Sequence, residues 1–286
     1  MMEQEYRPAY PGGKVKAFTM SYDDGVDSDI RLVEIMRKNG IRGSFNLNSG
    51  TFSTEPDTDP RYAWHKMTMQ QCVELYGEDM EIAVHGFRHC HWGKMPTAQA
   101  IAEILDDRRN LERMTGKPVR GAALPYNSFS DDVRRILELA EFRYCRGGKG
   151  RGKLEICDPE WICFQPTCHH KDPKLMEYAA QLIEAQVDYR SLYLMCVAGH
   201  SYEFVVKDDW HIIEELLEAV GNHEDIWYTT SIEFVEYLDA VKQLTRSEDG
   251  TMLVNPTNQD VWVQFEKQKR ILHIPAHSTV TIEDAC

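Results

Sequence analysis

The sequence of 286 residues predicts an α/β fold, a distorted β/α barrel of seven or eight units followed by a small β appendage. Apolar, strand-like runs alternate with amphipathic, helix-like segments from the N-terminus to about residue 243, which is the pattern of parallel β/α architecture. Alternation alone fits both a closed barrel and an open sheet. Two further observations favour the barrel: chemically active residues follow the ends of several different expected strands, and no phosphate-binding glycine fingerprint follows the first strand.

The expected strands are short apolar runs that end at polar or turn residues. The first contains Val15, Ala17, Phe18 and Met20 and ends shortly before two aspartates. In chain order the expected strands lie at 15–20, 44–47, 81–84, 119–124, 142–145, 161–164, 192–198 and 226–228.

The expected helices carry apolar residues at intervals of three and four, and several begin at a capping residue. The clearest helix begins at Thr97 and ends at Gly116, a residue that commonly terminates helices. Gly40 likewise ends the first helix. In chain order the expected helices lie at 28–39, 68–76, 97–116, 130–139, 173–186, 209–221 and 231–241.

The character of the sequence changes after Leu244, where alternating runs near Met252, Val261, Ile271 and Val280 predict three or four short strands. We therefore expect residues 1–245 to form the barrel and residues 246–286 to form a β appendage. About forty residues are few for an independent core, so the appendage is expected to pack on the barrel.

Composition excludes several classes of protein. The net charge of -14 argues against binding nucleic acid, which is itself a polyanion. The N-terminus lacks the features of a signal peptide, and the chain has no apolar run of about 18 residues, so we expect a cytoplasmic protein with no membrane partner. The eight cysteines contain no Cys-x-x-Cys pair and are expected to be mostly reduced.

The candidate site begins with Asp23-Asp24-Gly25, directly after the first strand, and continues with His85 and His89 about sixty residues later. One carboxylate and two imidazoles can hold a catalytic divalent metal with an open position, which leaves the second carboxylate free to act as a base. Each half also has a simpler explanation: Asp-Asp-Gly is a common turn sequence, and histidine pairs at this spacing arise by chance. Placement favours a site, because Asp23 and His85 both terminate expected strands.

The ordered motifs resemble those of the polysaccharide deacetylases with a NodB-homology domain, carbohydrate esterase family 4. The first family motif, Thr-Phe-Asp-Asp-Gly, is similar to the segment 21–25. The second, His-(Ser/Thr)-x-x-His, is similar to 85–89, with Gly86 in place of the hydroxyl residue, and the fifth, a strand that ends in histidine, is similar to 194–200. The resemblance covers residues 14 to 243 and implies a distorted β/α barrel.

The resemblance also implies roles for individual residues. Asp23 would be the catalytic base and His200 the general acid. Asp24, His85 and His89 would hold a divalent metal, with zinc expected first and cobalt or nickel as alternatives.

Two family motifs differ in this chain. The third, Arg-x-Pro-Tyr, here reads Ala123-Leu-Pro-Tyr126, so the arginine expected beside the base is missing; Arg120 or Arg143 are the candidates to replace it. The fourth motif, which supports the acid histidine, has no clear match, and the segments 158–161, beginning at Asp158, or 167–170 are its candidate substitutes.

The predicted function is a metal-dependent hydrolase that removes acetyl groups from N-acetylated or O-acetylated carbohydrates by attack of metal-bound water on the acetamide carbonyl. The backbone amide of Tyr126 would stabilise the oxyanion, while Trp161 and Trp64 are candidate platforms for stacking on a sugar. Core packing is the alternative for both indoles. The expected partner is a carbohydrate or a small amide substrate.

Two alternatives remain at this stage. The His-Gly-aromatic-x-His form of the second motif resembles a branch of the same superfamily that hydrolyses small amides and cyclic imides. The other alternative is a catalytically impaired carbohydrate-binding protein, and its only support is the missing arginine of the third motif.

Overall fold

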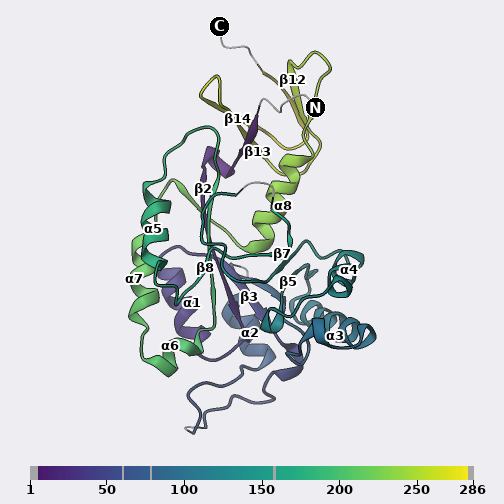
Figure 1. Ribbon diagram of the computed structural model, residues 1–286, viewed down its shortest axis with the longest axis vertical. Coiled ribbons are helices and arrows are strands. Elements are labelled where there is room, and N and C mark those ends of the chain that lie inside the picture. The colour runs from purple at the N-terminus through teal and green to yellow at the C-terminus, as the bar shows by residue number, and fades with distance from the viewer. Residues whose placement is uncertain (1–5, 60, 78, 157–158, 283–286) are drawn as a thin grey trace.

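The computed structural model describes residues 6–59, 61–77, 79–156 and 159–282, and its centre is a sheet of nine parallel strands (Figure 1). The strand order is β7-β6-β5-β4-β3-β2-β9-β8, and β10 pairs with the first half of β2. The strands are β2 (Lys16–Asp23), β3 (Gly43–Leu47), β4 (Glu81–Val84), β5 (Gly121–Ala123), β6 (Tyr144–Arg146), β7 (Ile162–Phe164), β8 (Cys168–His169), β9 (Tyr193–Gly199) and β10 (Ile226–Tyr228).

One continuous segment connects the two edges of this sheet. Its first part, β7, pairs with β6, and its second part, β8, pairs with β9 on the opposite edge. The prediction of a distorted β/α barrel is therefore confirmed. All eight expected strands are present, and the two-residue strand β8 is an addition because so short an element has no detectable periodicity.

Helices cover the outside of the sheet, with α1, α5 and α7 grouped on one side and α3 and α4 on the other (Figure 1). Their apolar faces pack on the strands: Leu32, Val33 and Met36 of α1, for example, are fully buried. The helices are α1 (Asp29–Lys38), α2 (Met69–Tyr76), α3 (Thr97–Thr115), α4 (Asp131–Leu139), α5 (Leu175–Glu184), α6 (Tyr202–Lys207), α7 (His211–Val220) and α8 (Ser231–Lys242). Single turns of 3₁₀ helix lie at η1 (Pro11–Gly13), η2 (Ser49–Thr51), η3 (Trp92–Lys94) and η4 (Pro125–Asn127).

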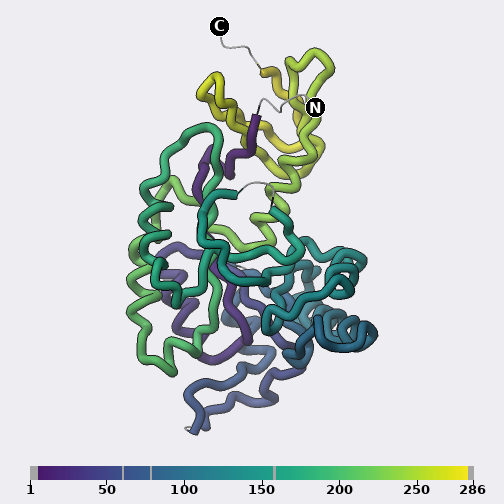
Figure 2. The backbone as a smooth tube through the Cα atoms, in the orientation of Figure 1, coloured from purple at the N-terminus to yellow at the C-terminus, as the bar shows by residue number. Residues whose placement is uncertain are grey.

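Two small antiparallel sheets lie at one end of the molecule, close to both chain ends (Figure 2). Their orders are β1-β13-β14 and β11-β12-β15, so the N-terminal strand β1 pairs with a strand from the C-terminal region. A second apolar core joins these sheets to α8, where the Tyr237 hydroxyl donates to the Ala9 carbonyl. The strands are β1 (Arg7–Ala9), β11 (Thr245–Arg246), β12 (Met252–Asn255), β13 (Val261–Phe265), β14 (Arg270–Ile274) and β15 (Ser278–Thr281).

Among the described residues, no helix has both the length and the apolar character needed to cross a membrane. The six cysteines within the described ranges are free thiols, while Cys157 and Cys286 lie outside those ranges.

Candidate metal and catalytic site

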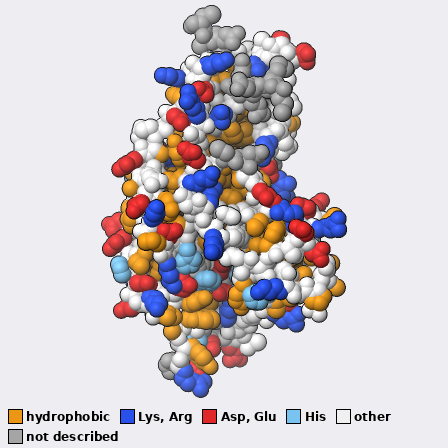
Figure 3. Space-filling view, viewed as in Figure 1, with side chains coloured by type: hydrophobic (Ala, Val, Ile, Leu, Met, Phe, Trp, Pro, Cys, Tyr) orange, Lys and Arg blue, Asp and Glu red, His pale blue; other side chains and the backbone are white. Residues whose placement is uncertain are grey.

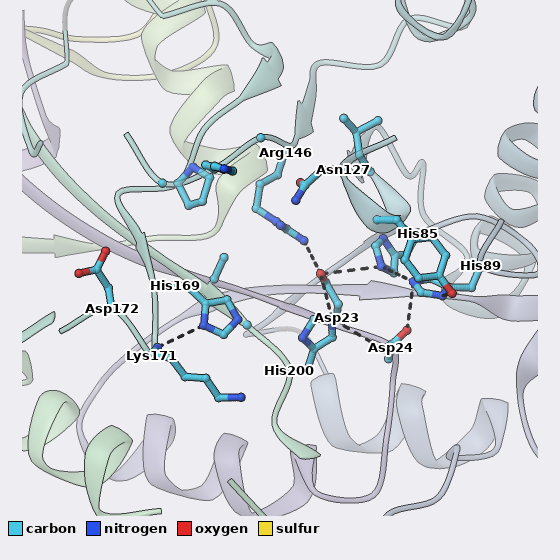
Figure 4. A pocket seen from close by; sticks show the side chains of 18 of the residues that line it. Asp23, Asp24, His85, His89, Asn127, Arg146, His169, Lys171, Asp172 and His200 are labelled. Atoms are coloured by element: carbon cyan, nitrogen blue, oxygen red, sulfur yellow. Dashed lines mark hydrogen bonds and ion pairs between the residues drawn. The ribbon is translucent and has the colours of Figure 1, made fainter. Parts of the chain in front are cut away.

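The residues expected to form the site meet at the carboxyl ends of the parallel strands. Asp23 is the last residue of β2, His85 follows β4, and His200 follows β9. Together with Asp24 and His89 they line a cavity of about 800 Å³. Histidine side chains gather near the hollow on this face of the molecule (Figure 3), and Figure 4 shows the side chains converging on Asp23 and Asp24.

Two backbone turns direct the side chains that are expected to bind a metal. Asp24 has a φ of 88° and the following Gly25 a φ of 63°, so the chain reverses immediately after β2 while the amide of Asp24 still donates to the Asn46 carbonyl. In the second turn, Gly86 has a φ of 84°, and a Cβ there would lie 2.7 Å from the indole nitrogen of Trp92. The glycine that replaces a hydroxyl residue in this motif is therefore required by local packing.

Asp24, His85 and His89 fit a divalent cation. Their ligand atoms all lie within 4.8 Å of one another, and the Nε2 atoms of the two histidines are 3.2 Å apart. Because His85 Nδ1 donates to the Ala123 carbonyl at 2.9 Å, the neutral ring presents the lone pair of Nε2 to the cavity. Three ligands from one carboxylate and two imidazoles leave coordination positions for water and substrate, as in catalytic zinc sites.

The electrostatics of this triad favour the ligand forms. Burial lowers the pKa of His85, while burial together with the neighbouring His85 lowers the pKa of His89 to about 4, so both rings are neutral near pH 7. Burial alone would raise the pKa of Asp24, but the Lys66 ammonium and the two histidines together lower it. Neutral imidazoles and an ionised carboxylate are the states that bind a metal.

Lys66 is a neighbour of this triad that sequence reasoning missed. Its Nζ donates to the Asp24 carbonyl and lies 3.4 Å from Asp24 Oδ1. The lysine reaches the site because the backbone of residues 65–67 pairs with residues 25–27, the turn that follows Asp24. No sequence motif marks this contact.

Arg146, the last residue of β6, lies beside Asp23, the expected base. Its Nη2 donates to both carboxylate oxygens of Asp23, at 2.6 Å from Oδ2, and its Nε donates to the Ser21 hydroxyl. Burial alone would raise the pKa of Asp23, but the Arg146 guanidinium outweighs burial and holds it below the ordinary value. Asp23 is therefore ionised near neutral pH.

The two arginines expected to replace the missing third-motif residue do not reach the site. Arg120 pairs with Glu236 and Arg143 pairs with Asp239, both on α8. That expectation was wrong because both residues precede the carboxyl edge: Arg120 comes just before β5 and Arg143 just before β6, whereas Arg146 ends β6.

His200 faces both aspartates, with its Nε2 3.9 Å from Asp23 Oδ2 and 3.9 Å from Asp24 Oδ2. On its other side, Nδ1 lies 3.6 Å from Glu203 Oε1, a carboxylate on α6. Burial acts to lower the pKa of His200, but Glu203 and the two aspartates more than compensate and raise it. A protonated imidazole is thus favoured at the position where an acid would be needed.

Glu203 is the centre of a second cluster of polar groups. Its Oε2 lies 2.9 Å from His170 Nε2, 2.9 Å from Lys171 Nζ and 3.5 Å from His169 Nε2. This cluster is less suited to a metal than the first, because the lysine ammonium already neutralises the carboxylate. In addition, the backbone amide of Lys171 donates to His169 Nδ1, which places the proton of the neutral ring on Nε2.

Glu203 lies beside His200, the expected acid, where the segments 158–161 and 167–170 were the candidates. In the second segment, His169 and His170 both lie beside the carboxylate of Glu203. Among the described residues, neither histidine forms a hydrogen bond or an ion pair with His200. Asp158, in the first segment, lies outside the described residues.

The aromatic residues divide between the cavity and the core. Tyr126 lies on η4 with a φ of 54°, is 58% exposed, and its hydroxyl is 3.1 Å from His89 Nδ1. Trp64 stacks on Tyr202 at the edge of the cavity. Trp161 does not reach the cavity: its ring packs against Phe164 and Phe234 in the second apolar core, so the expected substrate contact is corrected to a packing contact.

Known proteins with a similar sequence or structure support the β/α barrel fold described above. Residues 11–145 match the family model described as polysaccharide deacetylase, and no curated protein matches the chain. The chain is similar to a probable polysaccharide deacetylase from Pseudomonas aeruginosa PAO1, with a TM-score of 0.57 and 14% identity, covering 79% of this chain and 92% of that one.

Two further solved structures are similar over most of their length. The Puue allantoinase has a TM-score of 0.56 and 15% identity, with 82% of this chain and 94% of that chain covered. The chitin deacetylase from the fungal pathogen Colletotrichum lindemuthianum has a TM-score of 0.50 and 14% identity, with 77% and 88% covered. At such identities the likeness shows a common fold.

Proposed function

Because residues 11–145 match the family model of the polysaccharide deacetylases, we propose that the chain is a divalent-metal-dependent hydrolase that removes acetyl groups from N-acetylated or O-acetylated carbohydrates. One observation carries the proposal: Asp24, His85 and His89 form a metal-ligand set, and the ionised Asp23 and the acid His200 lie on the same cavity. A hydrolase of this class needs a ligand set, a base and an acid together.

Asp24, His85 and His89 would hold the metal, with zinc expected first and cobalt or nickel as alternatives. A divalent metal at such a site lowers the pKa of a water molecule towards about 7 and polarises the substrate carbonyl. Its ligands come from two turns fixed by Gly25 and Gly86, so the set is formed before any substrate arrives.

The remaining steps belong to side chains of this chain. Asp23, kept ionised by Arg146, accepts the proton of the attacking water. His200, kept protonated by Glu203, donates a proton to the leaving amine or alcohol. The backbone amide of Tyr126 is the proposed donor to the oxyanion, a contact worth about 3 kcal/mol in comparable sites.

The second candidate is a hydrolase of small cyclic amides with the same residues in the same roles. It is favoured by Gly86, which gives the second motif its His-Gly-aromatic-x-His form and packs closely against Trp92. The third candidate, an impaired carbohydrate-binding protein, loses its basis, because Arg146 supplies the arginine whose absence supported it.

The decisive experiment combines elemental analysis of the purified protein with product assays. We expect about one divalent metal ion per chain, acetate release from chito-oligosaccharides, N-acetylglucosamine derivatives or acetylxylan, and no hydrolysis of cyclic imides. Imide hydrolysis without acetate release would favour the second candidate. A metal-loaded protein with no activity on either class would overturn the hydrolase proposal.

Single substitutions test the proposed roles of the metal ligands and of the base. Asp24→Ala and His89→Ala should lose both metal and turnover, whereas Asp23→Asn should keep the metal and lose turnover. His211→Ala, which removes an exposed histidine at the start of α7, is the matched control and should keep both. Full activity of Asp23→Asn on every substrate would eliminate the proposed base.

A further inference from the structure

Asp29 is a fully buried carboxylate that the proposed chemistry does not use. It lies in the first turn of α1, five residues after Asp24, and has 0% exposure. Among the described residues, no lysine, arginine or histidine pairs with it, and its hydrogen-bond donors are two hydroxyl groups and a backbone amide. A buried carboxylate without a cation is costly unless hydrogen bonds compensate, so its partners indicate what it is for.

The partners of Asp29 come from three separate elements. Its Oδ1 accepts from the Ser201 hydroxyl at 2.5 Å. Its Oδ2 accepts from the Tyr76 hydroxyl at 2.7 Å and from the backbone amide of Val26 at 3.2 Å. Val26 belongs to the turn that carries Asp23 and Asp24, and Ser201 is the residue immediately after His200.

When Asp29 is ionised, the hydrogen bonds at the Ser201 end of this network have a single direction. The Ser201 hydroxyl is fully buried and donates to Asp29, so it accepts from the Ser28 hydroxyl, 2.7 Å away. Ser28 and Asp29 both belong to the start of α1, so the beginning of this helix holds the turn after β9. Hydrogen bonds that a single carboxylate accepts thus connect the turn bearing the proposed base and metal ligand to the turn bearing the proposed acid.

We propose that Asp29 is a positioning residue that fixes the acid His200 opposite the Asp23–Asp24 pair by bonding to Ser201 on one side and to Val26 on the other. The distances that depend on it are the two of 3.9 Å from His200 Nε2 to the carboxylates of Asp23 and Asp24. The inference rests on the proposed function for its catalytic consequence only; the positioning of His200 stands independently.

Two variants, each of which removes one hydroxyl group, distinguish an effect on the position of His200 from a general loss of stability. Ser201→Ala removes the bond that leads to the acid, while Tyr76→Phe removes a bond to the same carboxylate from α2, away from His200. Ser201→Ala removes the donor to Oδ1, and Tyr76→Phe removes one of the two donors to Oδ2, so some loss of thermal stability is expected in both variants. Only Ser201→Ala releases the turn that holds His200.

The first measurement needs no substrate. In ¹⁵N-histidine-labelled protein, with His200 assigned through His200→Gln, we expect the ring signals of His200 to shift or broaden in Ser201→Ala and to stay unchanged in Tyr76→Phe. Unchanged His200 signals in Ser201→Ala, or equal changes in both variants, would overturn the inference whether or not the protein is a hydrolase.

The second measurement uses the substrate found in the product assays. Ser201→Ala should lower kcat about tenfold with KM and metal content unchanged, while Tyr76→Phe should stay within about twofold of the parent protein. Equal kcat in the two variants would also overturn the inference. If no substrate is turned over by the parent protein, the proposed function fails and the ring signals alone decide the role of Asp29.

Discussion

Arg146 donates to both carboxylate oxygens of Asp23 although the two residues are 123 positions apart in the chain. They meet because β6 and β2 belong to the same parallel sheet and both residues are the last of their strands. Both side chains are about 8% exposed, so the pair is shielded from solvent. A buried pair of this kind is strongly destabilised when one partner is removed, because the other charge is left uncompensated.

Arg146→Met should therefore affect both stability and catalysis. Without the guanidinium, burial raises the pKa of Asp23, so the acid limb of the kcat/KM profile should move to higher pH and kcat at pH 7 should fall at least about tenfold. The free energy of unfolding should fall by roughly 3–5 kcal/mol. Urea unfolding, metal analysis and a pH–rate profile measure the three effects, with metal content expected to remain.

Arg120→Met is the matched control for this prediction. It removes an ion pair with Glu236 outside the cavity, and both side chains of that pair are partly exposed. Its kcat and pH profile should equal those of the parent protein. A pH profile of Arg146→Met identical to that of the control would show that Arg146 does not set the protonation of Asp23.

The position of residues at strand ends explains how much of this site could be predicted. Asp23, His85 and His200 lie at the carboxyl ends of different parallel strands, so their convergence could be inferred from the predicted strand ends. Arg146 obeys the same rule, but the exact end of a three-residue strand cannot be read from sequence, and Arg143 was an equally good candidate.

Other parts of the site depend on packing that sequence patterns do not encode. Glu203 lies on α6, a six-residue helix too short to show helical periodicity. Lys66 reaches Asp24 through backbone pairing of two loops. Trp161 was expected near the substrate. The direction of a side chain next to a short strand depends on neighbours such as Phe234, which the sequence does not reveal. The division at residue 245 remains a prediction, although β1 contributes to the sheet formed by β13 and β14.

Tyr126→Phe should weaken metal binding. The hydroxyl of Tyr126 lies 3.1 Å from His89 Nδ1 and orients the ring whose Nε2 faces the triad. Loss of such an outer contact typically reduces metal affinity about ten- to hundred-fold. Competition with a chelator measures the affinity, and Tyr62→Phe, which changes an exposed tyrosine outside the cavity, is the control. Equal affinities of the two variants would contradict this role of the hydroxyl.

Glu203→Gln should shift the alkaline limb of the pH–rate profile. The proposed acid, His200, must be protonated to act, and the carboxylate of Glu203 is the largest of the influences that raise its pKa. Removal of this charge lowers the pKa of His200, so activity should be lost at a lower pH than in the parent protein, while the rate at acidic pH changes less. Asp172→Asn, which removes a different carboxylate from the cavity lining, should leave that limb in place. A shift towards higher pH in Glu203→Gln would contradict the assignment of Glu203.

Glu81→Gln tests a buried carboxyl outside the proposed chemistry, at the first residue of β4. Burial raises the pKa of Glu81 to about 7 from an ordinary value of 4.5, although Ser44, Ile232 and Tyr144 all donate to it. Between these two pH values the folded protein keeps a proton that the unfolded chain has released, so the contribution of Glu81 to stability is complete below pH 4.5 and is lost as pH rises through 7. The loss is on the order of 3 kcal/mol.

Glutamine has no proton to release, so Glu81→Gln should be more stable than the parent protein at pH 8 and should lose this advantage at pH 5. Urea unfolding at the two pH values gives the comparison, and a difference between the two proteins that does not change with pH would show that Glu81 is already ionised throughout this range.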